Sequence, residues 1–462
     1  MSDSLKKGER LSFDITDLNN LGFGVGRAPD GRAVFIASCV AGDKVSAEII
    51  KVSKSFAVAR PLEILVPSPD REDGFCTASA SCGGCVYRYL TYERELALKQ
   101  SYVKHAFAKA GLADIEVEPV RSTGAVRGYR NKAEYPITEG KNGLYGGFYA
   151  PKTHRVVAAD GCSLQPAVFG EILRATCEFF TARGVHAYDE ATGKGLLRHL
   201  YLRHGVGSGE IMVVPVINGD ALPDEEEYVS MLRTRFPTVR SVMLNIHKKA
   251  TNVVLGRDYR LLFGTPYLTD VLCGLTFRIA PDSFYQVNHD AAELLYSIAA
   301  ERTELDGRGL LLDLYCGAGT IGLSMAQRAG EVIGVEIVPA AVECAKVNMA
   351  LNGIENASFY CGDAAVTEQL LAAAEQERGT LHPDVVILDP PRKGCDASLL
   401  DFLAARNVPR IVYVSCGPDS LARDVAHLVS LGYTPDRVTP VDLFPRTGHV
   451  ESVVCLTRTF NN

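Results

Sequence analysis

The chain has 462 residues, 47% of them hydrophobic and 22% charged, and a formal net charge of −7. This length and composition exclude a disordered or collagen-like chain and predict a globular protein of two or three domains. No apolar run approaches the roughly 18 residues of a membrane span, and no apolar stretch follows the first lysines, so we expect a cytoplasmic protein without a signal peptide. Its 13 cysteines should be thiols or metal ligands rather than disulfides.

The N-terminal part predicts a small β-barrel. Residues 1–63 alternate apolar and polar residues in short segments such as "RLSFDITDL" and "GRAVFIAS", with glycines and an Asp-Gly turn between them. Several short strands at this spacing are typical of a barrel of the OB-like kind. The Pro- and Asp-rich stretch "VPSPDREDG" then predicts a linker, and "YERELALKQSYVKHAFAKAG" predicts a helix.

The middle and the end of the chain differ in their patterns. Strand-like runs such as "EIMVVPVI", "SVMLNIH" and "TNVVLG" mix with a few helices, which predicts a central α+β domain over residues 64–279. From 280 to 462, apolar strands alternate with helices: "GLLLDLYCG", "EVIGVEI", "ASFYCGD", "DVVILDPP" and "RIVYVSCGP". Near-continuous apolar strands separated by helices predict a Rossmann-like, doubly wound parallel sheet.

A glycine-rich loop follows the first strand of this C-terminal domain. "DLYCGAGTIG" contains Gly317-x-Gly319-x-x-Gly322, and Glu336 ends the next strand about 20 residues later. These letters fit an NAD site, and they fit equally well the nucleotide half of S-adenosylmethionine. An acidic residue at this strand tip suits any adenosine with free ribose hydroxyls, so the loop alone leaves both readings open.

Three further side chains sit where predicted strands begin or end. Asp389 precedes two prolines in "LDPPRKG", Cys416 ends a strand in "YVSCGP", and Glu451 begins the last strand. Each alone also fits a turn residue, a packed thiol or an edge charge. Together they fit methylation of a pyrimidine at C5, because that reaction needs a thiolate to add at C6, a methyl donor and a base for the C5 proton. A thiol reaches its anionic form far more readily than a hydroxyl.

These motifs together resemble those of the bacterial 23S ribosomal RNA uracil-C5 methyltransferases. The resemblance rests on "QVN", "DLYCGAGTIGL", "GVEIVPAAVECAKVNMALNGIEN", "LDPPRKG", "YVSCGPDSLARD" and "LFPRTGHVESV", and the N-terminal barrel is similar to that family's TRAM domain. It implies S-adenosylmethionine as cofactor, a flipped-out uridine of 23S ribosomal RNA as substrate and a monomeric enzyme. It also implies that Cys416 is the nucleophile and Glu451 the base. The implied cofactor contacts are Gln286, Tyr315, Gly317, Gly319, Glu336, Asp363 and Asp389.

Alternatives remain at this point. A transfer-RNA uracil-C5 methyltransferase shares the catalytic motifs, and we expect it to lack the barrel and the cysteine cluster. An NAD-dependent oxidoreductase would have no use for Cys416 or Glu451, and a non-catalytic RNA-binding module would need neither. One position departs from the family: Gly417 stands where Asn is common, which raises the question of what replaces the amide.

Four cysteines predict a metal site. Cys76-x5-Cys82-x2-Cys85 lies in "CTASASCGGC", and Cys162 follows much later in "ADGCSLQP". Thiolates at a C-x2-C spacing in a reducing compartment hold either tetrahedral zinc or an iron–sulfur cluster, and the spacing does not choose between them. The resemblance implies a [4Fe-4S] cluster with a structural or RNA-positioning role.

Basic residues with interleaved aromatics predict RNA contact between 121 and 137. Such a pattern suits phosphates and stacked bases, and a net charge of −7 does not oppose it because binding needs only a local basic face. The residues concerned are Arg121, Arg127, Arg130 and Lys132, with Tyr129 and Tyr135 between them. Arg198 and Arg203 in "LLRHLYLRH" are predicted to line the same surface.

Overall fold

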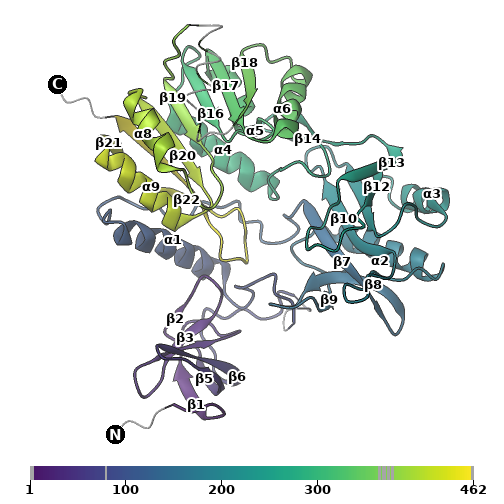
Figure 1. Cartoon of the computed structure of the whole chain (residues 1–462). Helices are drawn as coiled ribbons and strands as arrows, with labels where there is room; N and C mark the ends of the chain where they lie inside the picture. Colours follow the sequence, from purple (N-terminus) through teal and green to yellow (C-terminus); the bar gives the residue numbers. More distant parts are fainter. Residues whose placement is uncertain are drawn as a thin grey trace.

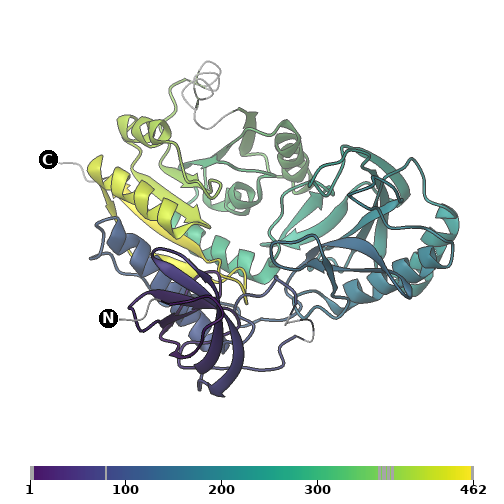
Figure 2. The same cartoon turned by 60° about the horizontal axis from the view of Figure 1, so that its bottom comes forward.

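The computed structural model describes residues 5–76, 78, 81–362, 366, 371, 375 and 379–458. Figures 1 and 2 show three parts: the N-terminal strands in purple, a mixed sheet in blue and teal, and a doubly wound sheet in green and yellow. Asp363, one of the predicted cofactor contacts, lies outside the described residues. None of the described helices is long and apolar enough to cross a membrane.

The N-terminal part is a six-stranded sheet in the order β1-β5-β6-β4-β3-β2. Alternate residues of β4 and β5 point into a small core, as the alternation in the sequence predicts. The strands are β1 (Arg10–Asp14), β2 (Asp17–Leu18), β3 (Gly24–Arg27), β4 (Ala33–Ile36), β5 (Lys44–Val52) and β6 (Phe56–Val66).

The central sheet runs in the order β13-β12-β11-β10-β7-β8-β9, with α2 and α3 packed on it. Its elements are β7 (Lys132–Gly140), β8 (Gly143–Tyr149), β9 (Val156–Ala158), α2 (Ala167–Thr181), β10 (Leu197–His204), β11 (Ile211–Ile217), α3 (Glu225–Arg235), β12 (Val239–Ile246) and β13 (Asp258–Gly264). The prediction of a strand at "TNVVLG" is wrong. The Asn245 amide binds the backbone N–H and carbonyl of Gly256, which turns this segment back onto β12.

The C-terminal sheet has the order β18-β17-β16-β19-β20-β23-β21, and β22 also pairs with β23. Strands β16 to β20 pair in parallel, and β23 runs antiparallel to β20, which confirms the Rossmann-like prediction. Before this sheet in the chain, β14 (Leu268–Leu272) and β15 (Leu275–Ile279) form a separate two-stranded sheet. The elements that follow are α4 (His289–Thr303), β16 (Leu310–Leu314), α5 (Thr320–Ser324), the short 3₁₀ helix η1 (Ala326–Arg328), β17 (Glu331–Glu336), α6 (Pro339–Leu351), β18 (Ala357–Cys361), β19 (Val385–Leu388), α8 (Ala397–Ala405), β20 (Arg410–Ser415), α9 (Pro418–Ser430), β21 (Tyr433–Pro435), β22 (Thr439–Val441) and β23 (Glu451–Arg458).

Helix α1 (Tyr92–Lys109) packs against the C-terminal sheet although it comes early in the chain. It lies alongside α9 in both views of the fold. Val103 and Phe107 are buried in the same apolar core as the strands β16, β19 and β20. The boundaries predicted at 63 and 279 stay predictions, and α1 shows that packing crosses the second of them.

Candidate active site

Four predicted site residues meet at one edge of the C-terminal sheet. Tyr315 follows β16, Glu336 ends β17, Asp389 follows β19 and Cys416 follows β20. Because these strands are parallel and adjacent, their carboxyl ends lie together, which is where open α/β sheets bind ligands. Glu451 reaches the same edge from the other direction, since it begins the antiparallel strand β23.

The glycine loop has the backbone of a ligand-binding turn. Gly317 and Gly319 have φ values of 55° and 79°, in the region that favours glycine. A Cβ on Gly319 would come within 3.0 Å of the Phe359 ring, so this glycine permits close packing. A Cβ on Gly317 would meet nothing within 4 Å, so the loop leaves open space on that side. Tyr315 also has a positive φ, 65°, a strained conformation that is common at functional sites.

Glu336 is held beside this loop. Its carboxylate accepts hydrogen bonds from the backbone N–H of Gly317 at 3.1 Å and of Val338 at 2.9 Å. Both bonds come from the backbone, so the carboxylate is fixed by the turn that it faces. An acidic side chain in this place suits ribose hydroxyls, which agrees with either nucleotide reading of the sequence.

The sequence analysis missed Asp313, which lies within β16. It is fully buried; its Oδ2 accepts the N–H of Gly322 at 2.9 Å, and its Oδ1 has no hydrogen-bond partner among the described residues. Burial raises the pKa of Asp313 to about 7, and Asp389 and Glu336 add to the rise. The signal was a single acidic residue inside the apolar run "GLLLDLY".

Burial shifts the pKa values of three side chains at this edge, Cys416, Glu451 and Asp389, and neighbouring charges add to the shift for the first two. Burial raises the pKa of Glu451 to about 8, with a further rise from Asp389. Burial also raises the pKa of the Cys416 thiol to about 11, and both carboxyls increase it. The pKa of Asp389 rises to about 7 through burial alone. The Arg392 guanidinium opposes the rise for Glu451 and Cys416, so a cation already lies near these two side chains.

The structure explains Gly417. This residue precedes α9, and a Cβ on it would lie 2.7 Å from the Ser420 hydroxyl. That hydroxyl donates to the carbonyls of Arg392 and of Gly417, each at 3.0 Å. Ser420 therefore occupies the space next to Gly417 and connects the start of α9 to the loop after Asp389.

Gln286 lies in an anchored segment between the central and C-terminal sheets. Its side chain is mostly buried, and its backbone carbonyl accepts the Asn131 amide at 2.9 Å. The backbone N–H of Asn131 donates to Val287, and the Asn288 amide donates to the carbonyl of Leu443 at 3.1 Å. The predicted cofactor contact is thus held between β7 and the loop that precedes β23.

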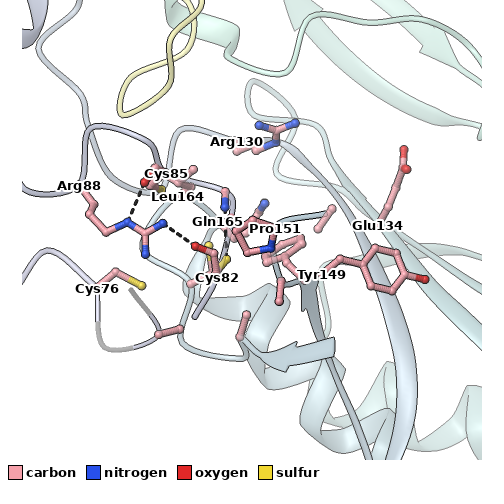
Figure 3. A pocket seen from close by; sticks show the side chains of 18 of the residues that line it. Cys76, Cys82, Cys85, Arg88, Arg130, Glu134, Tyr149, Pro151, Leu164 and Gln165 are labelled. Carbon is pink, nitrogen blue, oxygen red and sulfur yellow. Dashed lines mark hydrogen bonds between the residues drawn. The ribbon is translucent and has the colours of Figure 1, made fainter. Parts of the chain in front are cut away.

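The four predicted metal ligands line a single cavity of about 830 Å³, shown in Figure 3. Its wall includes Cys76, Cys82, Cys85 and Cys162. The Arg88 guanidinium donates to the carbonyl of Cys85 at 2.7 Å, which orders the loop between two of the cysteines.

The thiols of this cavity lie close enough to influence one another. Burial raises the pKa of Cys85 to about 12, and the three other cysteines add to the rise. A bound cation would reverse that effect, so four mutually destabilising thiolates fit a metal group chemically. Among the described residues, however, no group of three or more His, Cys, Asp or Glu side chains is placed to hold a metal ion. The cluster therefore stays a prediction.

Several predicted RNA contacts are wrong because their side chains point inward. Tyr135 is fully buried, and Tyr129 is buried with its hydroxyl donating to the carbonyl of Pro445 at 2.9 Å. Arg198 is buried and donates to the carbonyl of His247 at 2.7 Å, and Arg203 donates to that of Ser283 at 2.6 Å. The hydrogen bonds of Arg198 and Arg203 tie loops to the central sheet.

The remaining predicted contacts reach the surface. Arg121 and Arg127 are exposed, and Arg130 and Lys132 line the cysteine cavity. Part of the predicted basic surface is therefore present, and two of its residues, Arg130 and Lys132, lie at the cavity.

Comparison with known proteins decides between the readings of the glycine loop. The sequence model of the tRNA (uracil-5-)-methyltransferase family matches residues 91–459, and that of the TRAM domain matches residues 5–62. The chain belongs to the tRNA (uracil-5-)-methyltransferase family. It is an RNA uracil-5-methyltransferase that uses S-adenosylmethionine, and the oxidoreductase and the non-catalytic alternatives are excluded.

Two relatives that match over nearly their full length are named uncharacterized RNA methyltransferases. The enzyme is 38% identical to an RNA methyltransferase of Bacillus cereus over 459 residues, which cover 99% of this chain and 98% of the relative. It is also 38% identical to an RNA methyltransferase of Halalkalibacterium halodurans over 453 residues, with 98% of both chains covered.

A solved structure matches nearly the whole fold. The Pyrococcus abyssi tRNA (uracil-54, C5)-methyltransferase, in complex with S-adenosyl-L-homocysteine, aligns with a TM-score of 0.79 and 27% identity. The alignment covers 97% of this chain and 100% of the archaeal one. Coverage of this extent includes the N-terminal barrel, so our expectation that a transfer-RNA enzyme lacks the barrel is wrong for this structure.

Proposed function

We propose that this enzyme methylates C5 of a flipped-out uridine in 23S ribosomal RNA. The motifs that resemble the 23S enzymes support this choice, and so does the four-cysteine pattern. The likeness to an archaeal tRNA enzyme favours transfer RNA as the alternative substrate. We further propose a monomeric cytoplasmic enzyme.

The proposed reaction begins at Cys416. Its thiolate adds to C6 of the uracil, and the electron pair of the C5–C6 double bond moves toward C5 as an enolate. When bound, S-adenosylmethionine would supply the methyl group: C5 would form the new C–C bond as the methyl–sulfur bond breaks, and S-adenosylhomocysteine would leave with that bond's electrons. Glu451 then takes the C5 proton, the C5–H electrons restore the C5–C6 double bond, and the C6–S bond breaks to return the Cys416 thiolate.

The observation that carries the proposal is the placement of Cys416 and Glu451 at one sheet edge. The carboxyl of Asp389 raises the pKa of both side chains. A thiol and a carboxyl at the same sheet edge, near enough for Glu451 to raise the pKa of Cys416, are what addition at C6 and proton removal at C5 require. Arg392 lowers the pKa of both and so favours the ionised forms that react.

Seven side chains or backbone positions are proposed to hold the cofactor. Glu336 suits the ribose hydroxyls, and the carboxyl of Asp389 favours a sulfonium cation nearby. Gly317 lets the cofactor approach the backbone closely. The full proposed set is Gln286, Tyr315, Gly317, Gly319, Glu336, Asp363 and Asp389.

We propose that Cys76, Cys82, Cys85 and Cys162 hold a [4Fe-4S] cluster, with zinc as the alternative. Four thiols on one cavity wall support this proposal. Iron and acid-labile sulfide should both be present in protein purified without oxygen. Zinc without iron would refute the [4Fe-4S] cluster and support a zinc site instead.

The test of the catalytic proposal is Cys416→Ala. We expect this variant to lose methylation and to form no covalent adduct with RNA that contains 5-fluorouridine. Cys361→Ala, at the exposed end of β18, is the matched control and should retain both. Full activity of Cys416→Ala would refute the mechanism.

The substrate is tested separately with unmodified transcripts. The wild-type enzyme should methylate a 23S ribosomal RNA transcript and leave a transfer-RNA transcript unmodified. Methylation of the transfer RNA alone would overturn the choice of 23S RNA and leave the chemistry unchanged.

A further inference from the structure

The residue proposed as base, Glu451, begins the second strand of a hairpin. Val441 of β22 pairs with Glu451 of β23, and this pair closes the loop 442–450. Figure 1 shows this part of the chain, in yellow, reaching below the sheet toward the segment that precedes α1. The conformation of the 442–450 loop therefore sets the position of the Glu451 backbone, from which the carboxyl extends.

Arg446 fixes this loop from its centre. It is 2% exposed and has a φ of 69°, a conformation that an L residue keeps only where its surroundings enforce it. Its guanidinium donates to the carbonyl of Leu90 and, at 3.0 Å, to the carboxylate of Glu72. Its backbone N–H donates to Glu95 at 2.7 Å, and its carbonyl accepts the N–H of Tyr87 at 3.2 Å.

All of these partners come from one stretch of chain, which we call the cysteine segment: the described residues between 72 and 95. It contains Cys76, Cys82 and Cys85. Phe75, next to the first of them, is 3% exposed and carries the Arg446 guanidinium 4.5 Å from its ring centroid. The Arg127 guanidinium lies 4.6 Å from the same centroid. Phe75 therefore joins the cysteine segment to the loop of the base.

A buried ion network fixes the start of the same loop. The ammonium of Lys99 lies 2.7 Å from Glu95 and 2.8 Å from Asp442, and all three side chains are fully buried. Lys99 also donates to the carbonyl of Phe444 at 3.1 Å. The Tyr92 hydroxyl donates to Asp442 at 2.8 Å. Helix α1 thus holds the loop at Asp442, and Arg446 holds it four residues later.

We propose that Arg446 is a positioning residue for removal of the C5 proton, because it fastens the loop that ends at Glu451 onto the cysteine segment. This inference rests on the function proposed above. A base must lie within hydrogen-bond reach of the proton that it takes. Methyl transfer itself needs Cys416 and the cofactor, which lie on other strands, so loss of Arg446 should affect the last step selectively.

The first test is Arg446→Lys, which keeps the charge and loses the planar fork. The reaction is a single turnover with a 23S ribosomal RNA transcript, or with the transfer-RNA transcript if that is the RNA methylated, and with methyl-labelled S-adenosylmethionine. We expect methyl transfer within about twofold of wild type and release of methylated RNA slowed about tenfold, a part of the roughly 10²–10⁴-fold that a placed base contributes. The labelled enzyme–RNA adduct should therefore accumulate on a denaturing gel.

The matched control is Arg198→Lys. Arg198 is 4% exposed and also donates to backbone carbonyls, those of His247 and Lys249, but in the central sheet. It should lose stability without accumulating adduct. Equal slowing of methyl transfer and release in Arg446→Lys, or accumulation in Arg198→Lys as well, would overturn the positioning role.

A second variant keeps the inference testable if Arg446→Lys does not fold. Glu72→Gln weakens the ion pair with Arg446 at a side chain that is 36% exposed, so the fold should tolerate it. We expect smaller but selective adduct accumulation. The control Glu225→Gln weakens an ion pair with Arg260 in the central domain and should release RNA normally. Normal release in Glu72→Gln, with Arg446→Lys unfolded, would count against the inference.

The outcomes separate this inference from the proposed function. If Cys416→Ala still methylates RNA and wild type forms no adduct, the covalent mechanism is refuted for every variant. If wild type passes through the adduct and Arg446→Lys releases RNA at the normal rate, only the positioning role is refuted.

Discussion

Two groups of buried charged side chains lie a short way apart in this enzyme and are built differently. At the sheet edge, Asp313, Asp389 and Glu451 are carboxyls whose pKa values burial raises to about 7, 7 and 8. On helix α1, the carboxylate of Glu95 lies beside the Lys99 ammonium, which a second carboxylate, Asp442, also contacts. In the first group Arg392 opposes the rise in pKa for only one of the three carboxyls, Glu451. In the second group the Lys99 ammonium contacts both carboxylates.

The difference follows from what each group does. Lys99 opposes the rise that burial imposes on the pKa of Glu95, which still reaches about 7, and the same ammonium contacts Asp442, an arrangement that suits a network holding a loop in place. At the sheet edge Arg392 lowers the pKa of Glu451, whereas no cation among the described residues opposes the rise for Asp313 or Asp389, so a bound cation would reduce the free-energy cost of ionising these two. The proposed cofactor carries a positive sulfonium, so the sheet edge is arranged to be completed by its ligand. Perturbed pKa values of this kind cluster at functional sites.

The largest effect is expected when the cation of the second group is removed. Lys99→Met leaves Glu95 and Asp442 buried without their partner, which should lower the free energy of unfolding by about 3–5 kcal/mol. Urea titration of the purified protein measures this loss. Lys346→Met is the control, since its ion pair with Glu343 is exposed and should be worth less than about 1 kcal/mol. A similar small loss for Lys99→Met would show that the network does not hold α1 to the loop.

Removing a carboxyl from the first group should have the opposite sign. The pKa of Asp313 is raised to about 7, so its contribution to stability is present at acid pH and is lost as pH rises through about 7. Asp313→Asn keeps an acceptor for Gly322 and should be more stable than wild type at pH 8 by on the order of 4 kcal/mol, since the pKa of Asp313 rises by about three units, and equal to it near pH 4. Urea titrations at both pH values test this. A less stable variant at pH 8 would mean that the carboxylate has a favourable partner.

Activity should rise with pH. In the proposed mechanism Cys416 and Glu451 both react in their ionised forms, and burial raises the pKa of the thiol to about 11 and that of the carboxyl to about 8. The single-turnover rate should therefore increase from pH 6 to pH 9, by up to about tenfold per pH unit for each group that limits it. A rate that falls between pH 6 and 8 would exclude Glu451 as the base.

The smallest effect concerns the turn after Cys416. Gly417→Ala should cost stability because its Cβ would lie 2.7 Å from the Ser420 hydroxyl. Ser420→Ala should cost about 1 kcal/mol through its lost hydrogen bonds. The double variant should lose less stability than the two single variants together, since the hydroxyl that blocks the Cβ is gone. Strict additivity, measured by urea titration, would show that Ser420 is not what excludes a side chain at 417.

Much of the sheet edge could be predicted from sequence. Strand runs of four to six apolar residues, followed by Gly317, Asp389 or Cys416, mark both the parallel order and the edge, because each signal lies within a few residues of chain. The same local reasoning was wrong for "TNVVLG", where the Asn245 side chain competes for the backbone, and for Tyr129 and Tyr135, which alternate as a surface pair would but are buried.

The sequence by itself thus predicted the parallel, doubly wound sheet and the family, and it named Cys416 and Glu451 as the proposed reacting residues. Only the tertiary structure decided how the loop before Glu451, the proposed base, is held. Two residues of this loop, Arg446 and Asp442, form hydrogen bonds with side chains more than 300 positions earlier in the chain, those of Glu72, Glu95 and Lys99. Such contacts leave no periodicity and no spacing to detect, because they arise when α1 packs on a sheet formed from the other end of the chain. The same packing filled the space beside Gly417 with Ser420, which answers a question that the motif alone could only raise.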